Sequence, residues 1–592
     1  MKKAEPFAHS DGRAAAALSL VLAAVYWYFR CRTFGPGDSA EHVLAALTWG
    51  VPHPPGFPLS VALGYLMTLL PGPPEAAVNG LSGLCHAAAA GVFYLILRRT
   101  GCRPLSALAA TALMSFSELY WIYAEVAEVR ALNDLLALLS VHAAIVWSED
   151  RSQKALLALA ACLGLGLGHH PTYVFILPAV GLWVWLKKAW PKGRQWTWFL
   201  GALLAAIAIP YLILGLRLSY GAPPLFNPYA ITDWRDLPGL FLRTHYGGYN
   251  RMVAGTGFLG AAGFDFTRLQ MQASWFLGSL WRDLSLPGLA LAAAGAWTLW
   301  RKGPRPLLGL WLAWLGGTAV LFIIAASQQM IVCSLDYAQA LVVKYHVLPE
   351  LALFALCGPA LDELLGRVRK PLAFGLIAAA VFIPLLLRPV DLSKRQPLYD
   401  YGIDLLRGSR DGDLLVLASD DSIFAMTYLQ IRRPELVGSR VLLYPSHFTF
   451  LPYLRALRER HPELHVPFGT GGFSKEWDRW ESLNPGRAIL IEAVLRDEIR
   501  DRFPDAAPKG VWVALGGAKK APHAALEAGG RGLLAASAGL SRADVQARTQ
   551  DIYVLKAYAM NLEWYGSLLT RPADRPLVEA IRVRLRELGY ER

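Results

Sequence analysis

The chain has 592 residues, of which 54% are hydrophobic and only 17% charged, and its mean hydropathy is +0.33. This composition is typical of a membrane protein and excludes an ordinary soluble globular protein. Six cysteines without a framework or CxxC spacing indicate neither a disulfide scaffold nor a zinc site. The net charge of +13 would suit nucleic-acid binding, but the positions of the basic residues argue against it.

Apolar runs long enough to cross a bilayer recur up to residue 388. Residues 14–29 follow basic residues without a clear cleavage site, so we expect a retained first span and not a cleaved signal peptide. The sequence predicts about eleven spans, near residues 14–31, 76–97, 104–123, 131–147, 155–168, 171–186, 197–216, 284–300, 306–326, 341–361 and 371–388. The short, proline-bounded run 57–71 is expected at the interface or as a re-entrant segment.

Basic residues gather in alternate connections between these spans. With the N-terminus in the cytoplasm, the cytoplasmic connections hold 18 Lys and Arg against 6 Asp and Glu, which accounts for nearly the whole net charge of +13. The basic balance is therefore a topology signal, and we predict no nucleic-acid partner. These connections are residues 1–13, 98–103, 148–154, 187–196, 301–305 and 362–370.

An unusually polar stretch, residues 37–59, follows the first span directly. Asp38 and Glu41 have the spacing of a helix N-cap and a first-turn acid, so capping alone is one interpretation and catalysis by a carboxylate is the other. Four prolines stiffen the backbone around His53, and Gly56 allows a turn where a side chain would obstruct. We interpret this stretch as the floor of an active site at a membrane surface, with a purely structural turn as the alternative.

The segments DSAE at 38–41 and GVPHPPGFPL at 50–59 resemble the D-S-G-E and G-V-x-H-P-P-G-Y-P-L signature of a membrane family similar to protein O-mannosyltransferases. Ala40 replaces the usual Gly and Phe57 the usual Tyr, and neither change removes an ionisable group. The family is placed among the GT-C glycosyltransferases, which take sugars from polyprenyl-phosphate carriers. The resemblance implies a GT-C-like helical membrane fold, and it covers the chain up to about residue 390 far better than the remainder.

Two further segments resemble the same family. EVRALN, beginning at Glu128, is similar to E-V-Y-A-L-N with Arg130 in place of Tyr; the two charges either contact substrate or form a pair that orders a loop. A glycine-rich run ends in His169 and His170, as in the family's G-L-x-x-G-x-H-H-T. A metal shared by adjacent histidines needs a distorted turn and further ligands. Hydrogen bonding to a phosphate or a sugar hydroxyl is therefore the favoured role.

The loop 217–283 carries arginines among aromatic residues, among them Arg217, Arg243 and the neighbouring His245. Arginine binds phosphate in a bidentate manner and aromatic rings stack on sugars, so this loop suits an anionic lipid head group. Interfacial anchoring explains the Trp residues equally well. Lys344, where the family usually has Arg, either meets the same phosphate or extends to solvent.

After residue 389 the composition becomes that of a soluble protein. Short apolar runs alternate with segments of helical period, which predicts an α/β domain over residues 390–592 on the extracytoplasmic side. Asp420 and Asp421 follow the first strand, where we expect a turn or a helix cap. The membrane domain is expected over 1–389, with extracytoplasmic loops 32–75 and 217–283. The four runs expected to be strands are residues 414–417, 441–443, 488–491 and 511–514.

We therefore predict a membrane glycosyltransferase with Asp38 as general base and Glu41 assisting, acting by a single displacement with inversion. The donor would be a polyprenyl-phosphate-linked sugar, and the acceptor an extracytoplasmic hydroxyl on a protein, a lipid or a glycan. Whether a divalent cation assists is left open. The competing class is a transporter or flippase of a lipid-linked substrate, which we disfavour because no charged residue stands out at the centre of a predicted span. A receptor-like sensor would leave residues 38–58 unexplained.

Overall fold

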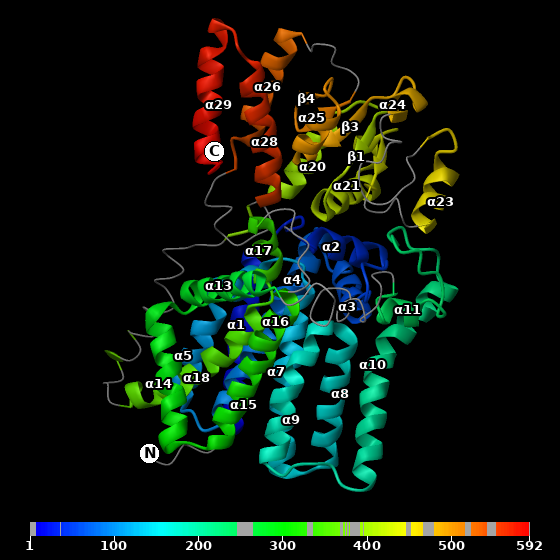
Figure 1. The fold of residues 1–592 in the computed structure, drawn as a ribbon. Helices are drawn as coiled ribbons and strands as arrows, with labels where there is room; N and C mark the ends of the chain where they lie inside the picture. The colour runs from blue at the N-terminus through cyan, green and yellow to red at the C-terminus, as the bar shows by residue number, and fades with distance from the viewer. Residues whose placement is uncertain are drawn as a thin grey trace. The chain divides into compact units, whose positions relative to one another are not determined.

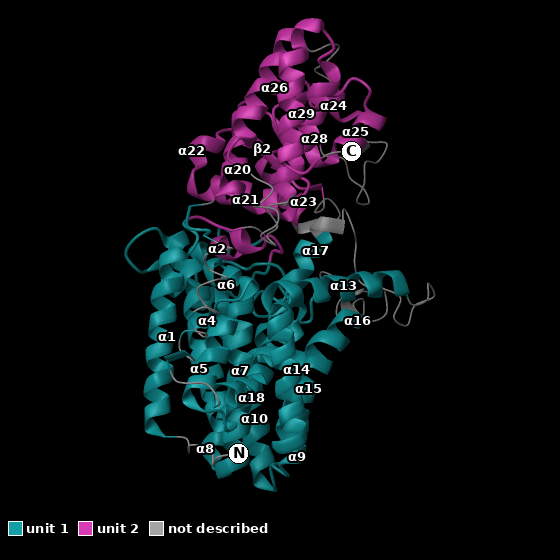
Figure 2. Cartoon of the chain, turned by 90° about the vertical axis from the view of Figure 1, so that its left-hand side faces the viewer, with its two compact units in different colours: residues 1–32, 45–227, 231–395 teal, residues 33–44, 228–230, 396–592 magenta. Residues whose placement is uncertain are grey.

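The computed structural model describes residues 8–590 except 36, 245–264, 328–334, 367–370, 373–374, 376–377, 379–390, 395, 446–450, 466–478, 516–521 and 541–551. Its contacts divide the chain into two compact units (Figure 2). The helical unit comprises residues 1–32, 45–227 and 231–395, and the α/β unit comprises residues 33–44, 228–230 and 396–592. Each unit is described by itself.

Helices make up most of the helical unit (Figure 1). They are α1 (His9–Phe29), α3 (Pro58–Thr68), α4 (Pro74–Arg99), α5 (Pro104–Ser115), α6 (Glu118–Glu125), α7 (Val129–Asp150), α8 (Gln153–His169), η1 (Pro171–Ile176), α9 (Leu177–Leu186), α10 (Arg194–Tyr220), α11 (Leu237–Phe241), α13 (Phe266–Asp283), α14 (Ser285–Lys302), α15 (Arg305–Leu315), η3 (Gly316–Leu321), α16 (Phe322–Ser327), α17 (Leu335–Val343) and α18 (Val347–Leu365). Helix α2 (Ser39–Thr48) begins in the α/β unit and ends in the helical unit.

Five helical segments in the described part of the chain are long and apolar enough to cross a membrane: α1, α4, α7, α10 and the stretch from α15 to Ile324. The predicted span 104–123 is not one straight helix, because α5 and α6 meet at a bend of 65°. Helices α3 and α8 and the pair η1–α9 are apolar but shorter. Most of the predicted span 371–388 lies outside the described residues. The count of eleven spans thus stays a prediction.

Helix α4 lies at the centre of the unit because small residues allow its neighbours to approach closely. A Cβ atom at Gly80 would collide with the ring of Trp27 of α1, and one at Gly83 would lie 2.9 Å from the Cβ of Tyr26. Tyr26 is fully buried, and its hydroxyl donates to the carbonyl of Ser115 at 2.7 Å. This packing fixes the start of α4, which follows the proline-rich turn and α3 in the chain.

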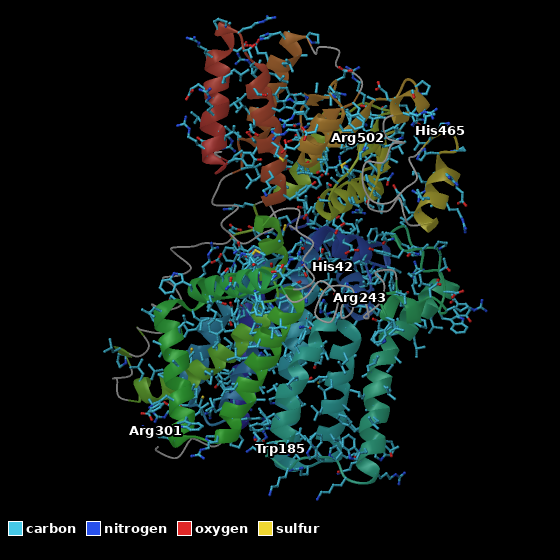
Figure 3. The ribbon with its side chains drawn as sticks, viewed as in Figure 1. His42, Trp185, Arg243, Arg301, His465 and Arg502 are labelled. Carbon is cyan, nitrogen blue, oxygen red and sulfur yellow. The ribbon has the colours of Figure 1, made fainter. Side chains whose placement is uncertain are left out.

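The six connections predicted to be cytoplasmic meet one another in the helical unit. Each contact joins two of these connections, so the connections predicted to lie on the same side of the membrane do lie together. In Figure 3, Trp185 and Arg301 lie at one end of this unit and Arg243 lies at the other. The contacts are Arg98 Nε to Asp11 Oδ1 at 2.6 Å, Arg99 Nη1 to Glu149 Oε2 at 2.8 Å, Arg103 N to Asp362 Oδ1 at 3.0 Å, Arg151 Nη2 to the Lys187 carbonyl at 3.0 Å, and Lys302 Nζ to Glu363 Oε1 at 3.0 Å.

The α/β unit contains a five-stranded sheet in the order β2-β1-β3-β5-β4. Its strands are β1 (Leu414–Val416), β2 (Val441–Leu443), β3 (Ile489–Glu492), β4 (Ala507–Lys509) and β5 (Trp512–Ala514). The first three are parallel, with Leu415 opposite both Leu442 and Leu490, whereas β5 runs antiparallel to β3 and β4. Four strands coincide with the apolar runs; β4 was not predicted, since Pro508 and Lys509 interrupt its apolar pattern.

Helices surround this sheet (Figure 1). They are α20 (Pro397–Arg407), α21 (Asp420–Arg432), α22 (Pro434–Val437), α23 (Leu451–Arg460), α24 (Trp480–Leu483), η6 (Ala493–Leu495), α25 (Arg496–Arg502), α26 (His523–Ser537), α28 (Ile552–Leu568), η7 (Pro572–Asp574) and α29 (Arg575–Glu587). All residues of β1, β2 and β3 are buried, which explains their uninterrupted apolar sequence.

A buried carboxylate ties the sheet to two of these helices. Glu492 is fully buried and accepts hydrogen bonds from the hydroxyls of Tyr401 and Ser422, both at 2.7 Å, and from the N–H of Ala418 at 2.8 Å. Burial raises the pKa of Glu492 above its usual range, because it penalises the charged form, although these donors oppose the shift. The carboxylate therefore joins α20, the end of β1, α21 and β3.

Candidate active site

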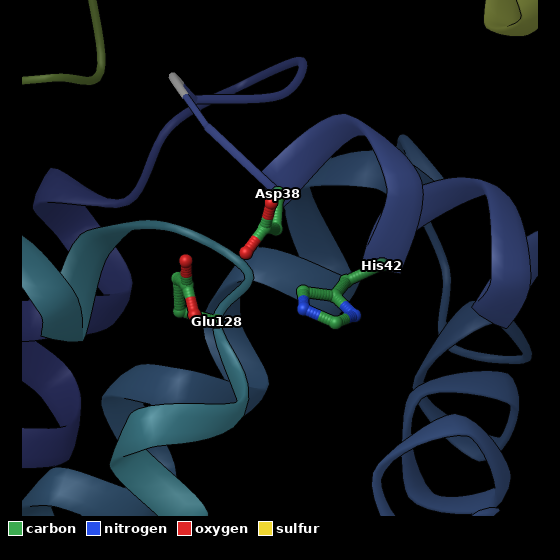
Figure 4. Close-up of side chains that lie close together, drawn as sticks. All are labelled: Asp38, His42 and Glu128. Atoms are coloured by element: carbon green, nitrogen blue, oxygen red, sulfur yellow. The ribbon is translucent and has the colours of Figure 1, made fainter. Parts of the chain in front are cut away.

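Asp38 caps the helix that carries the first predicted motif. Its carbonyl accepts from the N–H of His42 at 3.0 Å, so Asp38 stands at the N-cap of α2. Figure 4 shows Asp38 at the start of this helix and His42 one turn later. The Asp38 residue is only partly buried, whereas Glu41 is completely buried. Asp38 thus stands at the N-cap position without being fully buried, so capping and a catalytic carboxylate are compatible.

The residues just before Asp38 pack within the α/β unit. The N–H of Gly37 donates to Asp421 Oδ1 at 2.9 Å, and the ring of Phe34 lies 4.9 Å from that of Tyr428 on α21. The N-cap of α21 is Ser419. Asp420 and Asp421 thus lie in the first turn of α21, which agrees with the expected turn or helix cap. The Asp421 side chain also holds a loop 384 residues away in sequence.

The proline-rich turn has the non-helical backbone that the sequence predicts, up to the start of α3 at Pro58. Gly56 has φ +82°, and a Cβ atom there would lie 2.6 Å from a methyl carbon of Leu240 on α11. The hydroxyl of Tyr211 on α10 donates to the carbonyl of Pro55 at 3.0 Å. Helices α10 and α11 thus fix the turn that carries His53.

Arg130 lies in a buried cluster built from four parts of the helical unit. Its Nη1 donates to His170 Nδ1 at 3.2 Å, and its guanidinium carbon lies 3.8 Å from the ring centroid of Tyr345. The Phe57 ring stacks on His170 with centroids 5.7 Å apart, and the His53 ring lies 5.0 Å from that of Phe57. The predicted residues from the proline-rich turn, the EVRALN segment and the histidine pair therefore come together.

A second cation lies beside this cluster. Lys344 Nζ is 3.0 Å from Oε1 of Glu128, which directly precedes α7 (Figure 4). The two side chains are only 5% and 3% exposed. Lys344 therefore does not extend to solvent, and the alternative in which Glu128 pairs with Arg130 is wrong: Glu128 pairs with Lys344, while Arg130 bonds to His170.

The adjacent histidines point their hydrogen bonds to different partners. His169 Nε2 donates to the Val129 carbonyl at 3.0 Å. His170 Nδ1 accepts from the N–H of Thr172 at 3.1 Å as well as from Arg130. Burial, followed by the charge of Arg130, lowers the pKa of His170 well below its usual range. His170 is thus a neutral acceptor that orients Arg130.

The length of α7 sets the distance between this cluster and the end of the helical unit where the basic connections meet. The helix begins beside Glu128 and ends near Glu149, which pairs with Arg99 at the end where the basic connections meet. Its 22 residues rise about 33 Å at 1.5 Å each, close to the thickness of a bilayer's hydrocarbon core. The buried cations therefore lie about one hydrocarbon thickness along α7 from the basic end.

Arg217 and Arg243, two of the residues predicted in the loop 217–283, lie in different surroundings. Arg217 lies at the end of α10, where its Nη1 donates to the Ala222 carbonyl at 2.6 Å and its guanidinium lies 5.9 Å from the ring centroid of Trp49. Arg243 is half-buried, and its charge contributes to the lowered pKa of His170. His245 lies outside the described residues.

Sequence reasoning missed a buried acid–base pair within the spans. His86 Nε2 on α4 lies 3.3 Å from Asp134 Oδ2 on α7, and both residues are almost fully buried. Asp134 lies near the start of α7 and not at the centre of the predicted span 131–147, so the expectation that no charged residue is centred in a span is not contradicted. The signal was its position four residues after Arg130, which puts both side chains on one helix face.

The helical unit thus has the long apolar helices of a membrane protein and holds a buried cationic cluster near the start of α7. Residues 38–193 match the family described as "Protein O-mannosyl-transferase TMEM260 N-terminal domain". Protein O-mannosyl-transferase TMEM260 of Mus musculus is 32% identical over 257 residues, which cover 42% of this chain and 36% of the relative. The Dictyostelium discoideum protein of that name is 24% identical over 235 residues, covering 36% and 28%.

The chain thus spans about a third of the length of these relatives, and the predicted resemblance is confirmed for the part that carries the motifs. Among solved structures, ArnT from Cupriavidus metallidurans bound to undecaprenyl phosphate has a TM-score of 0.47 at 12% identity, covering 86% of this chain and 99% of that one. The S. cerevisiae Pmt1-Pmt2 complex bound to the sugar donor has a TM-score of 0.32 at 15% identity, covering 37% and 35%.

Proposed function

We propose that this protein is a membrane glycosyltransferase of the GT-C kind, which moves a sugar from a polyprenyl phosphate to an acceptor hydroxyl. The observation that carries the proposal is the pair of buried cations, Arg130 and Lys344, at the end of α7 away from the basic connections. Two buried positive charges are costly unless anions accompany them. Glu128 accompanies Lys344. A lipid phosphate supplies the further negative charge that Arg130 suits, because guanidinium matches phosphate geometry.

In the proposed reaction, the acceptor oxygen attacks the anomeric carbon of the donor sugar. The bond from that carbon to the phosphate oxygen breaks, and polyprenyl phosphate leaves. Asp38 takes the proton of the acceptor hydroxyl, and a single displacement inverts the anomeric centre. Arg130, Lys344 and Arg243 stabilise the negative charge that develops on the leaving phosphate.

The other predicted residues have supporting roles in this proposal. Because Glu41 is completely buried, we assign it the positioning of α2 and not direct contact with the acceptor. His170 holds Arg130, His169 holds the start of α7, and His53 lies beside the same ring stack. Arg217 is assigned an outer contact with the head group.

The proposed topology places the chemistry outside the cytoplasm of an inner or plasma membrane. The N-terminus and the basic connections face the cytoplasm, and the α/β unit faces outward. The names of the TMEM260 relatives make a protein hydroxyl the first acceptor to test. A lipid or glycan acceptor in the envelope is the second.

A transporter of a lipid-linked substrate is the alternative, and the buried His86–Asp134 pair favours it. Ionisable groups inside a membrane often mark ion or proton pathways. A transporter would bind the lipid and move it without breaking the bond between sugar and phosphate.

The decisive experiment incubates the purified full chain with labelled polyprenyl phosphomannose and an acceptor peptide rich in Ser and Thr. We expect release of polyprenyl phosphate, and about 10²–10⁴-fold slower turnover in Asp38→Asn, because a positioned base contributes that much. Glu149→Gln, which changes a carboxylate at the basic end, is the matched control and should retain the parent rate. Lipid binding without release would overturn the transferase proposal and favour the transporter. Near-normal turnover in Asp38→Asn would overturn the assignment of the base.

A further inference from the structure

A narrow crevice with both polar and apolar walls lies within the helical unit beside the two buried cations; Phe175, Phe322, Tyr345 and Leu348 form its apolar part. Arg130, Asn133 and Asp134 line it from α7, Thr172 lines it from η1, Thr318 from η3, and Lys344 from the turn after α17. Thr318 belongs to η3, a π-helical turn within an otherwise α-helical stretch, a feature that is frequent at functional sites. The interior has room for about one water-sized group.

Two polar atoms of the residues that line this crevice, Asn133 Oδ1 and Arg130 Nε, have no hydrogen-bond partner among the described residues. Asn133 is 1% exposed, and its Oδ1 has no hydrogen-bond partner among the described residues. A buried amide oxygen in that state costs free energy, so a hydrogen-bond donor on a bound substrate would stabilise it. Asn79 of α4 gives the contrast, because it is equally buried but donates to the Cys31 carbonyl at 3.0 Å and accepts from the Ala127 N–H at 2.7 Å.

The chemistry of the wall defines what enters. Arg130 and Lys344 on this wall suit the phosphate, whereas the Asn133 amide oxygen and the Asp134 carboxylate accept hydrogen bonds and favour a donor group. Thr318 already donates its hydroxyl proton to the Trp314 carbonyl at 2.7 Å, which leaves its oxygen as a third acceptor. A hydroxyl group has the right size and polarity, whereas a whole sugar ring does not fit.

We propose that Asn133, with Asp134 and Thr318, forms a specificity pocket for one hydroxyl or hydroxymethyl group of the donor sugar. This inference rests on the proposed function and names the residues that would contact one edge of the donor sugar. The phosphate lies at Arg130 and Lys344, and the adjoining ring presents one hydroxyl to the crevice. A site that hydrogen-bonds a substrate hydroxyl discriminates strongly against analogues that lack it, because its own polar groups are then left unpaired.

The test compares polyprenyl phosphomannose with its monodeoxy analogues on the full chain and on Asn133→Ala. In the parent, one deoxy position should lower kcat/KM about 10-fold or more. Asn133→Ala should lower kcat/KM for the complete donor by a similar factor and should no longer distinguish it from that analogue. Binding of polyprenyl phosphate without sugar should stay within twofold of the parent.

Asn79→Ala is the matched control, since it removes a buried amide that is fully bonded elsewhere. It should lower the thermal midpoint without changing the ranking of the deoxy donors. Thr318→Val, close in volume, should weaken discrimination at the same sugar position as Asn133→Ala. Unchanged discrimination in both variants would overturn the pocket and mean that the crevice holds a structural water. Failure of the parent to bind polyprenyl phosphate at all would overturn the proposed function instead.

Discussion

The buried ion pair between Lys344 and Glu128 allows a quantitative prediction about the site. Its atoms are 3.0 Å apart and its side chains are 5% and 3% exposed, so each charge depends on compensation inside the protein. Removing one partner of a buried pair typically costs about 3–5 kcal/mol, because it leaves the other charge uncompensated. Removing both with residues of similar volume costs much less. We expect Lys344→Met and Glu128→Gln each to destabilise the protein by about 3 kcal/mol.

The double variant should be destabilised by about 2 kcal/mol less than the sum of the two single destabilisations. Equilibrium unfolding in mixed micelles, followed by tryptophan fluorescence, measures the four proteins of this cycle. Purely additive effects would refute the pairing. The same cycle separates stability from function, because the double variant, although folded, lacks Lys344 and should bind polyprenyl phosphate at least 10-fold more weakly than the parent.

Two further predictions concern buried groups outside this pair. Because the pKa of His170 is lowered in the folded chain, only the unfolded chain binds a proton there at mildly acidic pH, so stability should fall as the pH drops below about 6.5. His170→Gln should reduce the slope of the thermal midpoint against pH. Equal slopes in the parent and the variant would contradict this prediction. Glu492→Ala should destabilise the α/β unit by about 3 kcal/mol, because Tyr401, Ser422 and the Ala418 N–H each lose a buried acceptor. Limited proteolysis measures the loss of stability, and an unchanged rate of cleavage in the α/β unit would contradict the prediction.

The sequence was most informative where local physics decides the structure. The apolar runs at β1, β2 and β3 are fully buried strands, and the prolines around His53 give the non-helical turn they predict. The partners of Glu128 and Arg130 were not foreseeable, because Lys344 follows more than 200 residues later in the chain. Local charge spacing suggested a pair between neighbours, whereas the tertiary packing of α7 against distant segments set the actual partners.

The same reason explains the groups that were missed. Asp134 looked like one polar residue at the start of an apolar run, and only the packing of α4 on α7 brings His86 to it. Glu492 ends a strand whose other residues are apolar, and its three donors come from three separate segments. Buried polar groups of this kind depend on long-range contacts that no local pattern reports.

The hydrogen bond from Gly37 to Asp421 has a consequence for how the protein is made. The loop that carries Asp38 emerges early in synthesis, but its partner in the α/β unit is translated 384 residues later. A chain truncated after residue 395 would keep the spans and the cation cluster while the proposed base lacks its anchor. The anchor of the proposed base would thus form only after the C-terminal unit has folded, and we expect an unfinished chain to lack the proposed transferase activity.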